Sequence, residues 1–459
     1  MKKRILAIAL VLIMTISVGM VFAGGQQEKE TAAPAVQSKY SVEEIKSWDL
    51  TPGMPFSGAK VQALLHPSGQ NNLIKKYLTE FTEMTGIEVE IETIPYGDLY
   101  QKFTIEAVSG TSDYDVFISH YTWVPALSNY LEPLNNRIEN DGIDLTRWSD
   151  AYIESCSFDG EVYGLPLRTH PMMLFYRKDL YEKYDLQEPA TFEEFQHNAK
   201  VITENEDMYG TALQYGKTAE QVVYPWLTYL WANGAEMFDA DWRPAFNTPK
   251  GIEATKDYMK PILEDNSAAP GSVSYSEYDA NLSFTTGEAA MVYAFWWAYG
   301  NFQNPDSSEL TVDQIGFCNV PGVDGNQVSY AMSMPLSVTS FSDVKDASWE
   351  FVKWANSAKM DLRAVTDKSD PKMLTSVAAQ FATLRDPKVN ELNNGLHNVA
   401  ATILETARTQ PSFPEWVQAA EKVVLALNNV ASGESEVEEA LAKAEKEVTE
   451  IMVRAGYYK

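Results

Sequence analysis

The residues with the clearest chemical potential are aromatic, and the densest group is the run Phe295-Trp296-Trp297-Ala298-Tyr299. The chain holds 11 tryptophans and 24 tyrosines, which is rich for a sequence with so many helical patterns. Indole and phenol rings combine a flat apolar face with a polar edge. They can therefore cover the C–H face of a sugar ring and still hydrogen-bond. Because neighbours on a strand point to opposite sides, one ring of the Trp296–Trp297 pair is expected in the core.

Polar side chains that could bond the hydroxyl groups of such a ligand follow two predicted buried strands, at 61–65 and 115–119. Between them, Ile87, Val89 and Ile91 alternate with glutamates as a third predicted strand, with a helical pattern on either side. The resulting strand–helix–strand–helix–strand order is typical of an α/β unit with parallel strands. Ligands in such sheets bind at the carboxyl ends of the strands. The sequence therefore directs attention to residues 66–72 and 120–123, although Gln70 and Asn71 could instead cap the helix that follows them.

Motifs for catalysis or metal binding are missing from the sequence. The five histidines show no metal-ligand spacing, and there is no nucleophile elbow, P-loop or dinucleotide fingerprint. Asp239 and Asp241 resemble only the start of a calcium loop. We therefore expect no metal, no cofactor and no enzyme. Two alternatives stay open. A secreted glycosidase needs only two suitably placed carboxylates among the 64 acidic residues, and a lectin or chemosensory sugar receptor needs no catalysis.

The first residues predict export. A basic start at 1–4, an apolar stretch at 5–22 and Ala23 before a polar run match a secretory signal peptide over residues 1–23. The alternative is an uncleaved membrane anchor, because the apolar stretch is near the minimum that spans a bilayer. No cysteine near Ala23 could carry a lipid. We expect the mature chain in the periplasm or another extracytoplasmic space.

Charge and cysteine content narrow the partners. The formal net charge is −28, and removal of the basic signal peptide makes it more negative. Nucleic acid and anionic membranes favour basic surfaces, so neither is an expected partner. Such a charge suits a protein that stays monomeric. Cys156 and Cys318 are too few for a disulfide scaffold, and they form either one bridge or two buried thiols.

The remaining pattern predicts two lobes. Residues 24–58 have the composition of a flexible leader, with a short helix from Ser41. Predicted strands return at 289–294, 314–320 and 333–338 after a long helical stretch. Crossings near residues 165–169, 280 and 335 would form a hinge, and a hinge between lobes makes a cleft. We assign 59–166 with 284–335 to an N-terminal lobe, and 167–283 with 336–459 to a C-terminal lobe.

Eight short motifs spread over the chain carry a family resemblance. They are 81–86 (FTEMTG), 113–117 (DYDVF), 160–166 (GEVYGLP), 175–180 (FYRKDL), 189–195 (PATFEEF), 231–234 (WANG), 284–292 (FTTGEAAMV) and 347–352 (ASWEFV). In order and spacing the chain resembles family 1 extracellular solute-binding proteins, the maltose-binding-protein type. The resemblance implies a two-lobed α/β periplasmic-binding-protein fold with hinge crossings. It also implies a monomer that closes on a small carbohydrate or polyol and delivers it to the permease of an ABC importer.

The resemblance also implies ligand contacts. They are Ser68, Gln70, Asn71 and Asn72 after the first strand; His120, Tyr121 and Trp123 after the 115–119 strand; Arg168 and His170 at the crossing; and Tyr224, Trp231, Trp296, Trp297, Tyr299 and Trp416. The alternative for the rings is the core, and for Arg168 a structural ion pair. Maltose binders carry charged residues where this chain has Ser68, Thr122 and His170. Maltose itself is therefore in doubt, and the ligand stays open.

Overall fold

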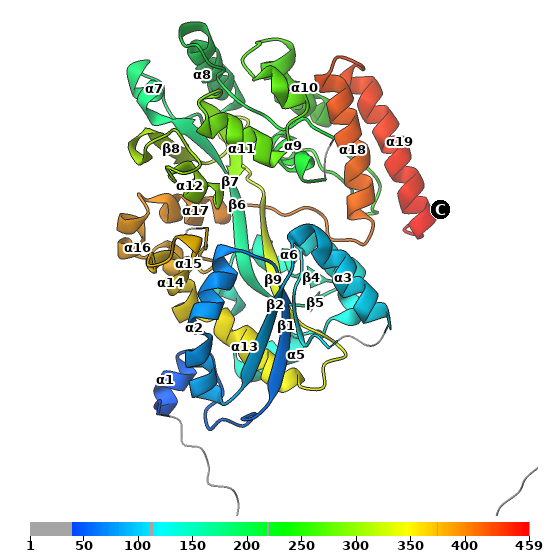
Figure 1. The fold of residues 1–459 in the computed structure, drawn as a ribbon. Coiled ribbons are helices and arrows are strands. Elements are labelled where there is room, and N and C mark those ends of the chain that lie inside the picture. Colours follow the sequence, from blue (N-terminus) through cyan, green and yellow to red (C-terminus); the bar gives the residue numbers. More distant parts are fainter. Residues whose placement is uncertain (1–38, 110–112, 218–219, 374, 459) are drawn as a thin grey trace, which may run out of the picture. The chain divides into compact units, whose positions relative to one another are not determined.

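The chain opens with the α/β unit that its pattern predicts. A computed structural model describes residues 39–109, 113–217, 220–373 and 375–458. Strand β1 (Lys60–Leu65) pairs in parallel with β2 (Glu88–Thr93) and with β3 (Val116–Ile118). Helices α2 (Gly69–Thr85) and α3 (Tyr96–Ser109) connect them (Figure 1). Helix α2 ends at Gly86, whose φ of 70° suits a residue without a side chain. The prediction of parallel opening strands is confirmed.

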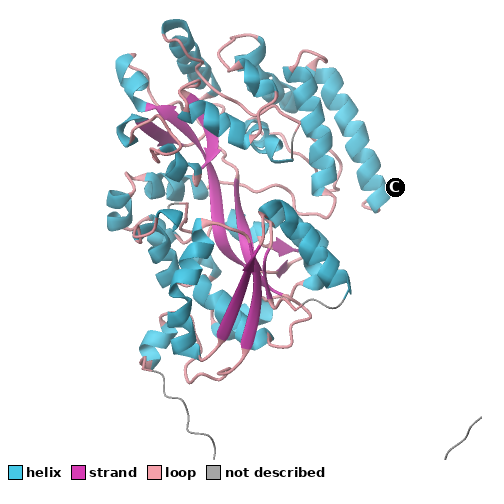
Figure 2. Ribbon diagram, viewed as in Figure 1, coloured by secondary structure: helices cyan, strands magenta, loops and turns pink. Residues whose placement is uncertain are grey.

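Two long strands continue this sheet across the molecule. In β6 (Leu165–Arg177), residues up to Pro171 pair with β9 (Ala331–Val338), and the rest pair with β7 (Met291–Phe295) and β8 (Ile315–Cys318). Strand β9 also pairs with β3. The sheet has the order β2-β1-β3-β9-β6-β7, with β8 also on β6 (Figure 2). We call the elements around β1 to β3 the first lobe and those around β7 and β8 the second lobe.

Short-range signals in the sequence are also confirmed. Asp159 and Gly160 have φ angles of 50° and 79° and join β4 (Ser157–Phe158) to β5 (Glu161–Val162) as the expected hairpin. Thr191 and Glu194 form a reciprocal capping box at the start of α8 (Phe192–Asn205). The remaining α-helices among the described residues are α1 (Val42–Lys46), α4 (Val124–Leu127), α5 (Asn135–Asp141), α6 (Asp150–Ser155), α7 (Lys178–Lys183), α9 (Val223–Ala232), α10 (Pro249–Leu263), α11 (Glu277–Thr285), α12 (Ala298–Phe302), α13 (Lys345–Ala355), α14 (Ala358–Thr366), α15 (Phe381–Leu384), α16 (Pro387–Leu392), α17 (Leu396–Leu404), α18 (Trp416–Ala431) and α19 (Val437–Ala455).

The lobes take up different parts of the chain from those predicted. Strand β9 returns the chain to β3, so α13 and α14 pack on α2 of the first lobe. They do not belong with the second lobe, where residues 336–459 were expected. Helices α18 and α19 pack on each other and on α10, so the chain reaches the second lobe between α17 and α18. Strand β7 pairs with β6 in the second lobe, although 284–335 were expected in the first.

The described part of the predicted leader, residues 39–58, is not a flexible leader. It packs on the first lobe, because Ile45, Trp48 and Leu50 are buried in the core. The Trp48 ring lies under Lys359 and Arg363 at 4.7 and 4.6 Å. The signal peptide predicted at 1–23 and the leader residues 24–38 lie outside the described residues. The chain from Ser38 to Lys459 forms one compact unit.

The structure bears on the predictions about a membrane span and about the two cysteines. Among the described residues, no helix combines the length and apolar character that a bilayer crossing requires. Cys156 and Cys318 are both buried free thiols, so of the two alternatives the structure has the unbridged one. Burial raises the pKa of the Cys156 thiol to about 12. Such a thiol is inert rather than nucleophilic at neutral pH.

Candidate ligand-binding site

Four basic or imidazole side chains gather where β1 and β3 end beside the crossing strand β6. We call His66, His120, Arg168 and His170 the arginine–histidine cluster. Arg168 donates from Nη1 to His66 Nε2 over 2.6 Å. A guanidinium can only donate, so this ring nitrogen accepts and the neutral imidazole of His66 carries its hydrogen on Nδ1. Burial, and then the charge of Arg168, lowers the pKa of His66 to about 3.

The other two histidines of the cluster are neutral as well. Burial, and then His66, lowers the pKa of His120 to about 3. Burial also lowers the pKa of His170, with Arg168 adding to the effect. Burial lowers the pKa of Arg168 only to about 10, so its guanidinium stays charged at neutral pH. The cluster therefore carries one positive charge. The described groups that act electrostatically on its four members include no carboxylate.

Aromatic rings of the first lobe border this cluster. Tyr96 stacks on Trp123 with ring centres 5.5 Å apart and planes 18° apart. Its ring also lies 5.8 Å from that of His66 and 5.6 Å from that of His120, in edge contacts. Trp123 is only partly buried. These two rings therefore offer an apolar surface next to polar groups.

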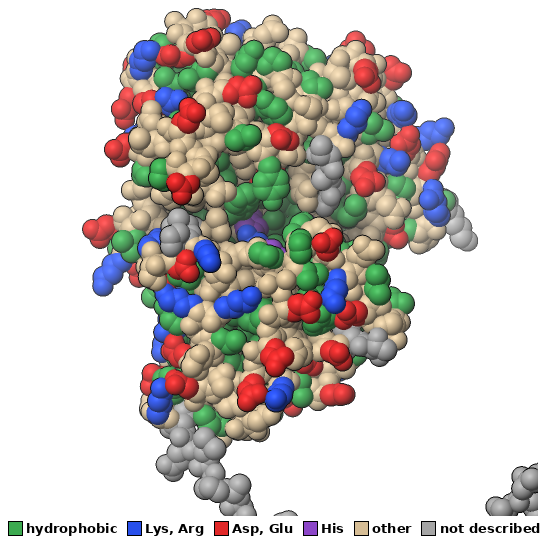
Figure 3. Space-filling model, in the orientation of Figure 1, with side chains coloured by type: hydrophobic (Ala, Val, Ile, Leu, Met, Phe, Trp, Pro, Cys, Tyr) green, Lys and Arg blue, Asp and Glu red, His purple; other side chains and the backbone are tan. Residues whose placement is uncertain are grey.

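A second aromatic pair comes from the second lobe. Trp297 precedes α12 and is partly buried, and its ring lies 5.9 Å from that of Tyr278 on α11. Tyr278 is 71% exposed, yet Tyr278 and Tyr96 both act to raise the pKa of Arg168. One tyrosine of each aromatic pair, and so one from each lobe, thus lies within electrostatic range of the same guanidinium. Figure 3 shows a hollow where Figure 1 places β6, with histidine and basic side chains at its floor and apolar side chains above.

The predicted contacts after the first strand hold the local backbone. Ser68 caps α2 by accepting a hydrogen bond from the Asn71 backbone at 3.2 Å, and Asn71 Nδ2 donates to the His66 carbonyl. Gln70 Oε1 accepts from the Val377 backbone at 3.4 Å. Asn72 is bonded to the carbonyl of Lys372 at 3.0 Å. These residues position His66 beside Arg168, and direct ligand contact by them stays a prediction.

Three other predicted residues lie in a buried aromatic stack. Tyr224 and Trp231 both lie on α9. Tyr224 stacks on Tyr330 with ring centres 4.3 Å apart, and the Trp231 ring lies parallel to that of Tyr330 at 6.2 Å. Tyr121 of the first lobe reaches Tyr224 at 6.2 Å and belongs to the same hydrophobic core. The Trp231 end borders a cavity of about 390 Å³ that also includes Trp242 and Arg408. The stack is therefore a contact between the lobes.

Two predicted residues are not brought to the arginine–histidine cluster. Tyr299 packs between Phe175 and Phe317, and its hydroxyl accepts from Asn394 at 2.9 Å. Trp416 is 1% exposed and packs edge-on against Phe413. Both rings serve the core, which was the alternative for each. Trp296 is the core member of its pair, as expected, and its Nε1 donates to the Thr169 carbonyl at 2.6 Å.

Sequence reasoning missed Tyr96 and Tyr278, which complete the two aromatic pairs. Tyr96 starts α3 and Tyr278 lies in the first turn of α11. Neither stands in a periodic pattern or in one of the motifs. His66 was within the predicted range 66–72 but was not singled out. The usable signal was the position of each residue next to a strand or helix end.

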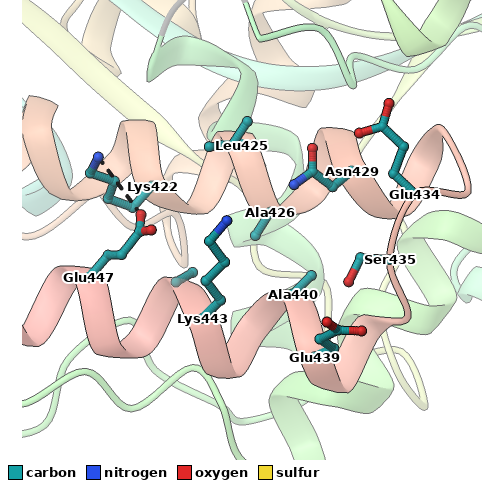
Figure 4. A pocket seen from close by; sticks show the side chains of 11 residues that line it. Lys422, Leu425, Ala426, Asn429, Glu434, Ser435, Glu439, Ala440, Lys443 and Glu447 are labelled. Carbon is teal, nitrogen blue, oxygen red and sulfur yellow. Dashed lines mark ion pairs between the residues drawn. The ribbon is translucent and has the colours of Figure 1, made fainter.

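A hollow between α18 and α19 is a poorer candidate. It encloses about 210 Å³ and is lined by solvated charged side chains, with an ion pair of 3.8 Å between Lys422 and Glu447 (Figure 4). No aromatic ring lines it. It is the groove between two packed surface helices. The described residues hold no cluster of three metal-ligating side chains.

Comparison with known proteins decides the family. The family model described as bacterial extracellular solute-binding protein matches residues 67–361, which is more than half of the chain. The chain belongs to the bacterial extracellular solute-binding proteins. The resemblance predicted from the sequence motifs is therefore confirmed, and the arginine–histidine cluster of this solute-binding protein lies largely within the matched range.

Relatives of this solute-binding protein differ in what they bind. A probable amino-acid ABC transporter periplasmic-binding protein of Sinorhizobium fredii is 25% identical over 88% of this chain and 92% of its own. An erythritol/L-threitol-binding protein of Mycolicibacterium smegmatis is 24% identical over 67% of this chain and 69% of its own. A solute-binding protein of Agrobacterium radiobacter K84 in complex with ribitol has a TM-score of 0.70 and 24% identity, covering 86% of this chain and 100% of its own. The α/β fold in two lobes is thus established.

Proposed function

We propose that this solute-binding protein binds a small carbohydrate or polyol between its lobes and delivers it to the permease of an ABC importer. The observation that carries the proposal is the meeting of two aromatic pairs, Tyr96 with Trp123 and Tyr278 with Trp297, at one polar cluster. Flat rings on both sides and hydrogen-bond donors and acceptors at the floor match the faces and edges of a sugar. The polyol-binding relatives support this ligand class.

The mechanism follows from the two lobes. The ligand first binds the rings and polar groups of one lobe, and rotation about β6 and β9 brings the other lobe over it. A ligand shifts this equilibrium only by its higher affinity for the closed form. Contacts from both lobes supply that difference. We propose that the closed monomer is the form that the permease accepts, outside the cytoplasm.

Chemistry at the site favours binding over catalysis. A glycosidase needs two carboxylates flanking the bond it cleaves. Among the described groups, no carboxylate acts on the arginine–histidine cluster. The buried carboxyl of Glu277, whose pKa burial raises to about 7, acts on Tyr278, but a single carboxyl does not make the pair. Neutral imidazoles beside a guanidinium can hold hydroxyl groups, but they give no acid–base pair for glycoside hydrolysis. We therefore propose a binding role without turnover.

A melting experiment tests the proposal. The protein from residue 24 onward is heated with each of a panel of monosaccharides, disaccharides and linear polyols. At a hundredfold excess over Kd, binding stabilises the folded state by about 2.7 kcal/mol, which raises the melting temperature. The ligand is then recovered and analysed by chromatography. We expect a shift with at least one small ligand, recovered intact. Hydrolysis would indicate a glycosidase, a shift only with long polymers a lectin, and no shift at all would contradict the proposal.

A further inference from the structure

Arg168 is a cation without a counter-ion among the described residues. Its guanidinium donates to His66 Nε2 at 2.6 Å and to Met334 Sδ at 3.7 Å, neither of which carries negative charge. Among the described residues, every other half-buried arginine, such as Arg177 or Arg363, has a carboxylate within 2.8 Å. Arg168 therefore departs from the pattern of this chain.

A partly buried charge with no partner is unfavourable, because the protein interior replaces water poorly. The Nε atom of Arg168 is buried and has no hydrogen-bond acceptor. The same holds for Nδ1 of His66, which carries the hydrogen of that ring. A carboxylate beside Arg168, like those beside Arg177 and Arg363, would offset the cost of the buried charge, and no described residue supplies one.

The charge of the whole chain adds to the argument. At a net charge of −28 the protein repels anions over most of its surface. A single uncompensated guanidinium at the floor of the hollow reverses that sign locally. Guanidinium groups match carboxylates with two parallel hydrogen bonds, which adds geometry to the attraction.

We infer that the ligand is an acidic sugar, an aldonate or a uronate, and that Arg168 selects it by binding its carboxylate. This inference rests on the proposed carbohydrate-binding function and narrows its ligand class. The aromatic pairs then cover the carbon chain or ring, and His120 and His170 face the hydroxyl groups. An amino acid also carries a carboxylate, but its ammonium group needs an anion. No carboxylate acts on the arginine–histidine cluster itself, and the buried Glu277 beside Tyr278, whose pKa burial raises to about 7, is only partly ionised at neutral pH.

Matched ligand pairs test the inference. D-Gluconate and D-glucitol, D-ribonate and ribitol, and D-glucuronate and D-glucose each differ by a carboxylate in place of a hydroxymethyl group. Titration calorimetry on the exported protein measures Kd for all six. We expect the acid to bind at least tenfold more tightly than its neutral partner in one or more pairs. D-Glucuronamide, which keeps the shape of glucuronate without its charge, should behave like the neutral sugar.

Variants separate a selective role from a structural one. Arg168→Gln should remove the preference for the acid, and Arg168→Lys should keep part of it because the charge remains. Arg385→Gln, at an exposed ion pair with Glu405, is the matched control and should leave every Kd unchanged. If neutral members bind as tightly as the acids, or if the amide equals glucuronate, the inference is wrong while the carbohydrate proposal stands. If no member of any pair binds and the carbohydrate panel is also silent, both fail. The comparison of acid with amide needs no variant, so it decides the question even where Arg168→Gln does not fold.

Discussion

Arg168 Nη1 lies 2.6 Å from Nε2 of His66, and this bond joins the crossing strand β6 to the residue that follows β1. The two residues are 102 positions apart in the chain. The loop after His66 is held in turn by α2, whose cap is Ser68 and whose first residue is Gly69. Gly69, which packs against Ser376, thus belongs to the helix start that follows His66.

Replacing Gly69 by alanine should destabilise the protein. A Cβ atom there would lie 2.6 Å from the Ser376 backbone nitrogen and 2.9 Å from its Oγ, so backbone has to move. Overpacking of this kind costs about 1–3 kcal/mol in the free energy of unfolding. Gly97→Ala is the control, because a Cβ there meets nothing within 4 Å. Urea unfolding should give a lower midpoint for Gly69→Ala only, and equal midpoints would show that this contact is not tight.

Lys353→Met should be strongly destabilising. The side chain of Lys353 is 2% exposed and pairs with Asp141 at 2.6 Å and Glu350 at 2.8 Å. Its loss leaves the buried Glu350 carboxylate without a cation, although Thr51 still donates to it, at a cost of about 3–5 kcal/mol. The exposed pair of Lys256 with Glu438 gives the control Lys256→Met, for which a change below about 1 kcal/mol is expected. A small effect at Lys353, measured by chemical denaturation, would show that the buried Glu350 carboxylate does not need this cation.

Trp297→Ala should weaken binding of whichever carbohydrate the panel identifies. Loss of a stacked ring costs about 1–3 kcal/mol, by analogy with bases stacked on aromatic side chains. That corresponds to a Kd increase of roughly 5- to 150-fold, measured by calorimetry. Trp242→Ala is the control, since Trp242 packs on Phe413 and borders the other cavity. The reverse result, with only Trp242→Ala weakening the affinity, would move the ligand to that cavity.

Stability should fall as the pH drops below about 6.5. Burial, and then Lys368, lowers the pKa of His397 to about 3. The unfolded chain takes up a proton at its usual pKa near 6.5 that the folded protein cannot take up, so each such group lowers the free energy of unfolding by up to about 1.4 kcal/mol per pH unit between these values. His397→Phe should therefore flatten the decline between pH 6.5 and 5 by roughly 2 kcal/mol.

Denaturation of the wild type and two variants at several pH values checks the sign. Asn398 is an exposed neighbour of His397 that does not titrate, so Asn398→Ala should leave the slope of stability against pH as it is in the wild type. Stability that rises on acidification, or an unchanged slope in His397→Phe, would contradict the burial of a neutral imidazole at this position.

Features that depend on neighbours in the chain could be predicted from the sequence. The alternation of Val89 and Ile91 with glutamates predicted β2, and Asp159-Gly160 predicted a hairpin, because both signals are local. The division into lobes could not be predicted, since it depends on β9 pairing with β3 far away. Trp48 was hidden because a low-complexity composition surrounds it. Helical spacing placed Trp416 on an apolar face but could not distinguish the core from a ligand wall.

The candidate site shows the same limit. The sequence identified Arg168, Trp123 and Trp297 through a family resemblance, and the structure adds the partners that give each a role. His66 and the tyrosines Tyr96 and Tyr278 join the site through contacts between distant segments. The missing counter-ion of Arg168 is likewise visible only in three dimensions.

A crystal structure with the tightest-binding carbohydrate of the panel tests the central claim most directly. We expect the ligand between the lobes, with one face against the ring of Trp297 and a polar group within hydrogen-bond distance of Arg168. A ligand bound anywhere else, for example beside Trp231 and Arg408, with the hollow over β6 filled only by solvent, would contradict the account.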